Sequence, residues 1–222
     1  MALSTCSATD NDGNTAEGSF DVTVVDTTAP ALSLPDDILT GPTGAFGAWV
    51  FVRSRATDLV DGRVRVTCDR LAWAWFPFGT TTVNCSATDR HGNASTDSYS
   101  VTVTGFRFRG FYRPVENQPA VNRVRAGSTV PIGWDLYGER GIPIPGRAAV
   151  VEGDPRAVAV SCQSPAGSGS AATSSGAPTW HGFGYGRWYD YYWRVPAGSG
   201  MCFRFEVKFT DGSTQAAYFE TY

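Results

Sequence analysis

The stretch Cys85-Ser86-Ala87-Thr88-Asp89, followed by Gly92-Asn93, occurs twice in this chain. Its first copy is Cys6-Ser7-Ala8-Thr9-Asp10 with Gly13-Asn14, which lies 79 residues earlier (85 − 6 = 79). The match continues, since Ser98-x-x-Val101-Thr102-Val103 repeats Ser19-x-x-Val22-Thr23-Val24. Identity at a fixed offset indicates an internal repeat. Because the first copy starts almost at Met1, we expect the chain to begin inside a repeat unit of a larger modular array.

The composition favours short strands joined by turns. The 222 residues include 25 Gly and 13 Pro together with many Thr, Val and aromatic residues. Polar and apolar residues alternate with period two over 20–25, 63–68, 80–85 and 99–103. This spacing predicts an all-β chain of tandem immunoglobulin-like β-sandwiches with disulfides. The hairpin of the first copy is marginal on its own, so we expect it to pack on another domain or chain.

The charge excludes some classes of partner. A formal net charge of −3 argues against a general nucleic-acid surface, which needs clustered basic residues. The segment 106–113 does interleave aromatic residues with Arg, as single-strand platforms do. A strand with its aromatic residues inward and its Arg outward explains the same pattern. No segment has the roughly 20 apolar residues of a membrane span, so we expect no membrane insertion.

The five cysteines predict two disulfides and an oxidising compartment. Cys68 and Cys85 lie inside the complete repeat unit and should pair, and Cys162 and Cys202 should pair in the C-terminal region. Cys6 corresponds to Cys85, so we expect it to be unpaired or intermolecular. Disulfides indicate an extracellular protein, secreted or at a cell surface. With no C-x-x-C pair and two histidines, the sequence predicts no zinc site and no cofactor.

Two runs carry a resemblance to a known family. Ala56-Thr57-Asp58-x-Val60-Asp61-Gly62-x-Val64-x-Val66-Thr67-Cys68 and Phe76-Pro77-x-Gly79-Thr80-Thr81-x-Val83-x-Cys85 resemble the hyalin repeat (HYR) domain. The resemblance covers residues 28–104, and residues 1–27 would be the last hairpin of a preceding copy plus a linker. It implies an immunoglobulin-like, extracellular module associated with adhesion and without catalysis. Trp73 and Trp75 depart from the family, which usually has small polar residues there.

The C-terminal region, residues 105–222, resembles a different module. Phe111-Tyr112-x-Pro114 and Ala126-Gly127-Ser128-Thr129-Val130-Pro131 are similar to the start of the PxKF-type domain of secreted actinobacterial proteins. Pro131-Ile132-Gly133-Trp134 stands where that family has Pro-x-Lys-Phe. Alternating residues predict a second β-sandwich here as well.

Aromatic residues are densest between residues 180 and 193. Period two sends Trp188, Asp190 and Tyr192 to one face of a strand and Tyr189, Tyr191 and Trp193 to the other. A sandwich strand needs only one of these faces for its core. The other face could be a ligand platform, a subunit contact, or packed under a neighbouring loop. The candidate ligand or interface aromatics are therefore Trp73, Trp75, Trp180, Trp188, Tyr189, Tyr191 and Trp193.

Acidic residues offer two weaker candidates. Asp10, Asp12 and Asn14 have the alternating oxygens of a calcium loop around a glycine, but no bidentate Glu follows. An aspartate that caps its own turn explains both copies of this motif. Asp58 and Asp61 could form a carboxylate pair for glycoside hydrolysis, but they lead into a turn glycine, which favours turn formation. We therefore assign no catalytic residue.

These observations predict a non-catalytic extracellular structural or adhesion protein. Its partners would be other protein subunits or surface proteins, or polysaccharide. One alternative is a carbohydrate-binding accessory region of a secreted hydrolase. Another is a self-assembling fibre subunit, whose N-terminal hairpin completes a sheet in a neighbouring chain.

Overall fold

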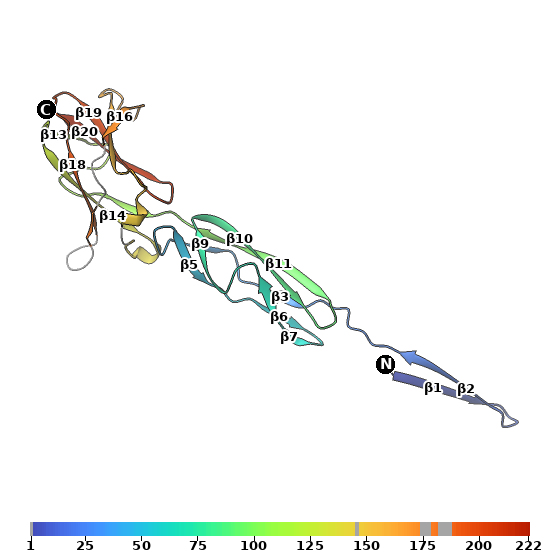
Figure 1. Ribbon diagram of the computed structural model, residues 1–222. Helices are drawn as coiled ribbons and strands as arrows, with labels where there is room; N and C mark the ends of the chain where they lie inside the picture. The colour runs from blue at the N-terminus through green and yellow to red at the C-terminus, as the bar shows by residue number, and fades with distance from the viewer. Residues whose placement is uncertain (1, 145–146, 174–178, 182–187) are drawn as a thin grey trace. The chain divides into compact units, whose positions relative to one another are not determined.

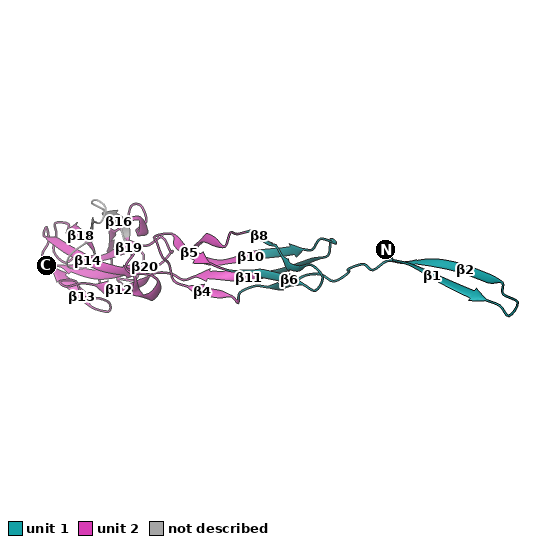
Figure 2. Ribbon diagram, turned by 90° about the horizontal axis from the view of Figure 1, so that it is seen from below, with its two compact units in different colours: residues 1–35, 53–69, 84–98 teal, residues 36–52, 70–83, 99–222 magenta. Residues whose placement is uncertain are grey.

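The computed structural model describes residues 2–144, 147–173, 179–181 and 188–222 (Figure 1). Strands make up nearly all of its regular structure, with two 3-10 turns, Glu139–Gly141 and Arg147–Ala149. Backbone contacts divide the chain into two compact units (Figure 2). Unit 1 comprises 1–35, 53–69 and 84–98, and unit 2 comprises 36–52, 70–83 and 99–222.

The N-terminal hairpin of unit 1 pairs β1 (Ala2–Thr9) with β2 (Thr15–Val22). The antiparallel register runs from Ala2 opposite Val22 to Thr9 opposite Thr15. Ser4 is the one half-buried residue of the two strands, and the others are exposed, including Leu3 and Phe20. Within the described residues, therefore, no element covers the apolar side chains of this hairpin.

The rest of unit 1 is built from short strands. A three-stranded sheet has the order β3-β6-β7, and β8 pairs with β10. β10 and β11 are long strands that contribute residues to both units. The bounds are β3 Ala31–Ser33, β6 Arg55–Asp58, β7 Gly62–Val64, β8 Val66–Cys68, β10 Gly79–Thr88 and β11 Ala94–Val103. The Cys68–Cys85 disulfide joins two directly paired residues of β8 and β10.

The first part of unit 2 contains β4 (Ile38–Thr40), β5 (Gly47–Phe51) and β9 (Trp73–Pro77). β4 runs parallel to β11, and β5 pairs with β9 in an antiparallel two-stranded sheet. The residues of this part that alternate inward are buried, and they are Ala48, Val50, Ala74, Phe76, Val83, Val101 and Val103.

The second part of unit 2 consists of two sheets. One has the order β12-β14-β18-β17 and the other β13-β20-β19-β15-β16. The strands of the first are β12 Arg107–Phe111, β14 Thr129–Tyr137, β17 Thr179–His181 and β18 Trp188–Arg194. Those of the second are β13 Val121–Val124, β15 Arg156–Val160, β16 Ser170–Thr173, β19 Cys202–Lys208 and β20 Thr214–Thr221.

Aromatic side chains fill the core of this second part. Trp193 packs against Phe203 and Phe219, with ring centroids 5.5 and 4.9 Å apart respectively. Trp134 stacks on Tyr189, the residue directly opposite it in the ladder, at 5.5 Å. Edge-on and offset contacts of this kind add to the free energy of burial. The core is therefore a continuous cluster of alternating strand residues.

The second disulfide, Cys162–Cys202, spans 40 residues of this part. Closing a loop of this length stabilises the fold by about 4 kcal/mol in the chain-entropy model. Both disulfides join the cysteines that the sequence pairs, and Cys6 is free and exposed. The chain is thus all-β, with its strands arranged in packed sheets and with two disulfides. The boundaries after residues 27 and 104 stay predictions.

Candidate functional site

An exposed aromatic face lies on the two-stranded sheet of β5 and β9 in unit 2. In the antiparallel register Trp49 lies opposite Trp75, and Phe51 lies opposite Trp73. Residues directly opposite each other share a face of a sheet, so these four side chains lie on one face. Trp49, Phe51 and Trp73 are each about half exposed, and Trp75 is partly buried. We call these four residues the aromatic face.

The rings of the aromatic face contact one another. The Trp49 and Trp73 rings are stacked, with centroids 5.8 Å apart and planes inclined by 10°. Trp75 meets Trp49 edge-on at 5.7 Å, and Phe51 lies 6.3 Å from Trp73. These are the offset-stacked and edge-on geometries that aromatic pairs prefer. The contacts hold the rings in place while part of each remains open to solvent.

The opposite face of the same two strands explains why these rings point outward. Ala48 and Phe76 are fully buried, and Val50 and Ala74 are nearly so. Alternation along each strand then forces Trp49 and Trp73 to the other side.

Gly47 allows the strand to begin close to its partner. Its φ is +150°, and a Cβ placed there would lie 2.1 Å from the backbone oxygen of Phe76. A larger residue would therefore push β5 away from β9 and disturb the aromatic face.

The candidate ligand aromatics of β18 lie in the core and not on a binding surface. Tyr189, Tyr191 and Trp193 are 1–3% exposed and belong to the core, so they are not a ligand surface. The reason is that the core of this sandwich needs one complete aromatic face of the strand. Tyr192, on the other face, is 63% exposed. The side chains of Trp180 and Trp188 lie outside the described residues.

The turn aspartates use their oxygen atoms within their own turns. Asp10 Oδ1 accepts hydrogen bonds from the backbone N–H of Asp12 and Asn14, and its Oδ2 accepts one from Asn14 Nδ2. These hydrogen bonds lower the pKa of Asp10. Asp58 Oδ1 likewise accepts from the N–H of Val60 and Asp61. Turn capping therefore accounts for the calcium candidate Asp10, Asp12 and Asn14 without a metal ion.

The alternating segment 106–113 contains β12, whose Phe side chains point inward, whereas Tyr112 after it is 40% exposed. Phe111 is buried and Phe108 half-buried, whereas Arg107 and Arg109 are exposed. The Arg109 guanidinium lies over the ring of Tyr137, 4.9 Å from its centroid. This arrangement matches the explanation of this segment as an ordinary strand.

A buried carboxylate of β14 lies close to Tyr137. Asp135 Oδ2 accepts hydrogen bonds from the hydroxyls of Tyr112 and Tyr137. Burial and the hydrogen bond to Asp135 raise the pKa of Tyr112 well above its ordinary value of 10.0. Tyr112 and Tyr137 therefore remain protonated and donate to this carboxylate.

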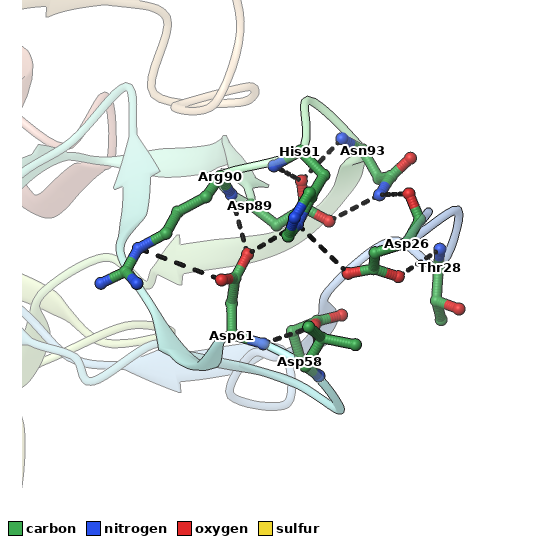
Figure 3. A network of polar contacts seen from close by, with 9 residues as sticks. Asp26, Thr28, Asp58, Asp61, Asp89, Arg90, His91 and Asn93 are labelled. Atoms are coloured by element: carbon green, nitrogen blue, oxygen red, sulfur yellow. Dashed lines mark hydrogen bonds and ion pairs between the residues drawn. The ribbon is translucent and has the colours of Figure 1, made fainter. Parts of the chain in front are cut away.

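Unit 1 brings together four residues that could hold a metal ion. They are Asp26, Asp61, Asp89 and His91, and one potential ligand atom from each lies within 4.8 Å of all the others (Figure 3). In the sequence Asp61 pairs with Asp58 as a turn or carboxylate candidate, and nothing connects it with Asp26 or His91. Their separation along the chain hides their proximity. Trp49 and Phe51 were likewise not predicted as site residues, although their alternation with buried residues is visible in the sequence.

Comparisons with known proteins add little to this geometry. No family model and no curated protein match the chain. An I-band fragment of titin has 10% identity and a TM-score of 0.33, and the match covers 99% of this chain and 73% of that one. A Bacteroides ovatus surface protein, SGBP-B of a mixed-linkage glucan utilization locus, solved with a mixed-linkage heptasaccharide, has 13% identity and a TM-score of 0.26. That match covers 89% of this chain but only 48% of the other. Likenesses at this level assign no role to any residue here.

The helices that the structure describes are all too short and too polar to cross a membrane.

Proposed function

We propose that the chain is a non-catalytic extracellular structural and adhesion protein, and that the aromatic face is its binding surface. The observation that carries this proposal is the exposure of Trp49, Phe51 and Trp73 on a sheet whose other face is already buried. These three rings are therefore not needed to fill the core beneath the sheet. Clustered Trp side chains are the residues that most often anchor a binding partner.

The sequence resemblances and the disulfides support the extracellular part of this proposal. Two disulfides suit an oxidising compartment and would be unusual in a reducing one. We propose that residues 28–104 are an HYR domain and residues 105–222 a PxKF-type domain, on the motifs quoted above. Other protein subunits or surface proteins would then be the partners.

A carbohydrate partner, as in an accessory region of a secreted hydrolase, is favoured by one specific observation. The Trp49 and Trp73 rings are inclined by only 10°, and both are about half exposed. Two nearly parallel indoles offer flat apolar surfaces, which suit the apolar faces of sugar rings. The aromatic face would then bind a polysaccharide chain, with no need for a reacting group.

Affinity electrophoresis in gels containing soluble polysaccharides tests this partner. We expect the wild-type chain to be retarded, and Trp49→Ala and Trp73→Ala each to lose at least tenfold in affinity. Tyr192→Ala is the matched control, because it removes an exposed aromatic residue of β18 outside the aromatic face.

Retardation that survives both Trp substitutions would show that sugars bind elsewhere. Without any retardation of the wild type, the carbohydrate partner is wrong. The adhesion proposal is then tested by whether Trp73→Ala lowers binding of the chain to whole cells or to a surface-protein fraction.

The fibre-subunit alternative is favoured by the exposed N-terminal hairpin. Leu3 and Phe20 are 69% and 56% exposed, and no described element covers them. A hairpin with bare apolar side chains and unpaired strand edges is suited to strand addition on a second copy.

A further inference from the structure

A cluster of three carboxylates and one imidazole lies in unit 1, and we call it the carboxylate–imidazole cluster. It comprises Asp26 from the segment after β2, Asp61 from the turn between β6 and β7, and Asp89 and His91 from the turn between β10 and β11 (Figure 3). One ligand atom from each of the four lies within 4.8 Å of the others. In the ligand shell of a divalent cation, atoms on opposite sides of the ion are about 4–5 Å apart.

One buried oxygen of this cluster lacks a hydrogen bond. The Asp26 side chain is only 5% exposed. Its Oδ1 accepts from the Thr28 N–H, but its Oδ2 is buried and has no hydrogen-bond partner. The Asp26 Oδ2 faces the His91 ring in Figure 3, at 3.6 Å from Nδ1. Leaving a charged oxygen buried without a hydrogen bond is costly, so this position favours a bound cation.

The charges of the cluster are not balanced by the side chains around it. Among the described residues, the Arg90 guanidinium and the His91 imidazole lie close to these carboxylates. Arg90 is 87% exposed and its Nε lies 3.9 Å from Asp61 Oδ1, so solvent screens this pair. A divalent cation would offset the mutual repulsion of the three carboxylates more completely than either side chain does.

We propose that the carboxylate–imidazole cluster binds a divalent first-row transition-metal cation of the Zn²⁺ type. An imidazole nitrogen among carboxylate oxygens suits such an ion, whereas Ca²⁺ selects oxygen ligands alone. The His91 Nδ1 lies 3.5 Å from Asp61 Oδ2 and 3.6 Å from Asp26 Oδ2. These separations are close to the roughly 3.4 Å edge of a tetrahedron with bonds of about 2.1 Å.

The ion would connect three segments that are distant in sequence. The Asn93 Nδ2 already donates to the backbone oxygen of Asp26 at 3.2 Å, which holds the segment after β2 against the β10–β11 turn. The Arg90 N–H donates to Asp61 Oδ2 at 2.9 Å, which likewise holds the β6–β7 turn against the β10–β11 turn. Coordination by Asp26, Asp61 and His91 would join all three segments at one point. The metal would thus act as a structural clamp on the segment that follows the N-terminal hairpin.

Isothermal titration calorimetry with ZnCl₂ tests the proposal on the full chain. The titrations use a Cys6→Ser background, because the exposed Cys6 thiol is itself a zinc ligand. We expect one Zn²⁺ per chain, with affinity lowered at least tenfold by Asp26→Asn and by His91→Gln. Asp10→Asn is the matched control, because Asp10 caps the equivalent turn of the first copy but lies outside the cluster.

Thermal unfolding gives a second readout that does not depend on heat signals. Zn²⁺ should raise the melting temperatures of the Cys6→Ser protein and of Asp10→Asn. It should not change the melting temperature of His91→Gln. The proposal is overturned if the Cys6→Ser protein does not bind one Zn²⁺ per chain. It is also overturned if Asp26→Asn and His91→Gln bind Zn²⁺ as tightly as the Cys6→Ser protein does. Calcium binding that His91→Gln does not weaken would also overturn it, because the imidazole would then not be a ligand.

Discussion

The two copies of the repeated stretch share the residues Cys-Ser-Ala-Thr-Asp and Gly-Asn and the same turn, but they have different surroundings. Asp89 Oδ1 accepts from the N–H of His91 and Asn93, and its Oδ2 accepts from Asn93 Nδ2. Asp10 accepts the same three hydrogen bonds from the equivalent residues, the N–H of Asp12, the N–H of Asn14 and Asn14 Nδ2. Yet Cys85 is 3% exposed and paired, whereas Cys6 is exposed and free.

This difference separates what local sequence determines from what neighbouring strands determine. An aspartate before a Gly-Asn pair forms its turn in either setting, because the hydrogen bonds run within the turn. Burial depends on partner strands. Cys85 has β8 beside it, and the second turn has Asp26 and Asp61 near it. The repeat thus predicts the hairpin, and only its neighbours decide whether the hairpin belongs to a core.

Substituting the cysteines should give the largest difference between the two copies in the free energy of unfolding. Replacing Cys68 and Cys85 together by Ser opens a loop of 17 residues, which should lower the free energy of unfolding by about 3 kcal/mol. Cys6→Ser removes no disulfide and should change the free energy of unfolding by less than about 0.5 kcal/mol. Denaturant unfolding measures both variants. Equal losses would mean that Cys6 is also part of a folded contact.

A smaller difference should come from matched valines. Val101 is fully buried, and Val22, its counterpart 79 residues earlier (101 − 22 = 79), is 42% exposed. Val101→Ala should cost about 2 kcal/mol in lost burial and cavity formation, and Val22→Ala less than about 0.5 kcal/mol. Unfolding and size-exclusion chromatography together test this pair. A clear loss of stability or of assembly size in Val22→Ala would show that a second copy covers the hairpin, as in the fibre-subunit alternative.

The turn aspartates Asp10 and Asp89 should give the smallest difference between the two copies, which is the loss of stability at acidic pH. Burial raises the pKa of Asp89, but hydrogen bonds from Asn93 and His91 outweigh it, so its pKa lies below 3.8. Hydrogen bonds from Asn14 lower the pKa of Asp10 in the same way. A carboxyl whose pKa is lowered by folding contributes stability above its unfolded pKa, and this contribution is lost as pH falls through its folded pKa.

Both carboxyls should therefore titrate below pH about 4 in a carbon-detected NMR experiment. Only Asp89 should affect global unfolding, since the Asp10 turn belongs to an exposed hairpin. Asp89→Asn should flatten the acid dependence of unfolding, and Asp10→Asn should leave it unchanged. A pKa of Asp10 at or above 3.8 would show that its turn hydrogen bonds do not stabilise the carboxylate in solution.

Much of the fold could be predicted because its signals are local. Period two in the C-terminal region predicts strands, and β14 and β18 are found there. The duplicated stretch identified Cys85 as the partner of Cys68 and left Cys6 over. The HYR and PxKF resemblances stay predictions.

The candidate sites were harder to predict because they depend on register and on contacts between distant segments. The sequence shows that aromatic residues alternate in β18 but not which face the core will use. The predictions of Tyr189, Tyr191 and Trp193 as ligand residues were therefore wrong. The aromatic face needs the β5–β9 register, which places Trp49 opposite Trp75. Likewise, Asp26 and His91 are 65 residues apart in sequence (91 − 26 = 65) and meet only in the folded unit.

The free cysteine in β1 has a practical consequence for work with this protein. Four of the five cysteines are held in disulfides, and Cys6 is exposed. Under non-reducing conditions a maleimide dye or spin label should therefore attach at Cys6 alone. A single reporter on the N-terminal hairpin would follow its motion in solution, with no engineered residue and no change to either sandwich.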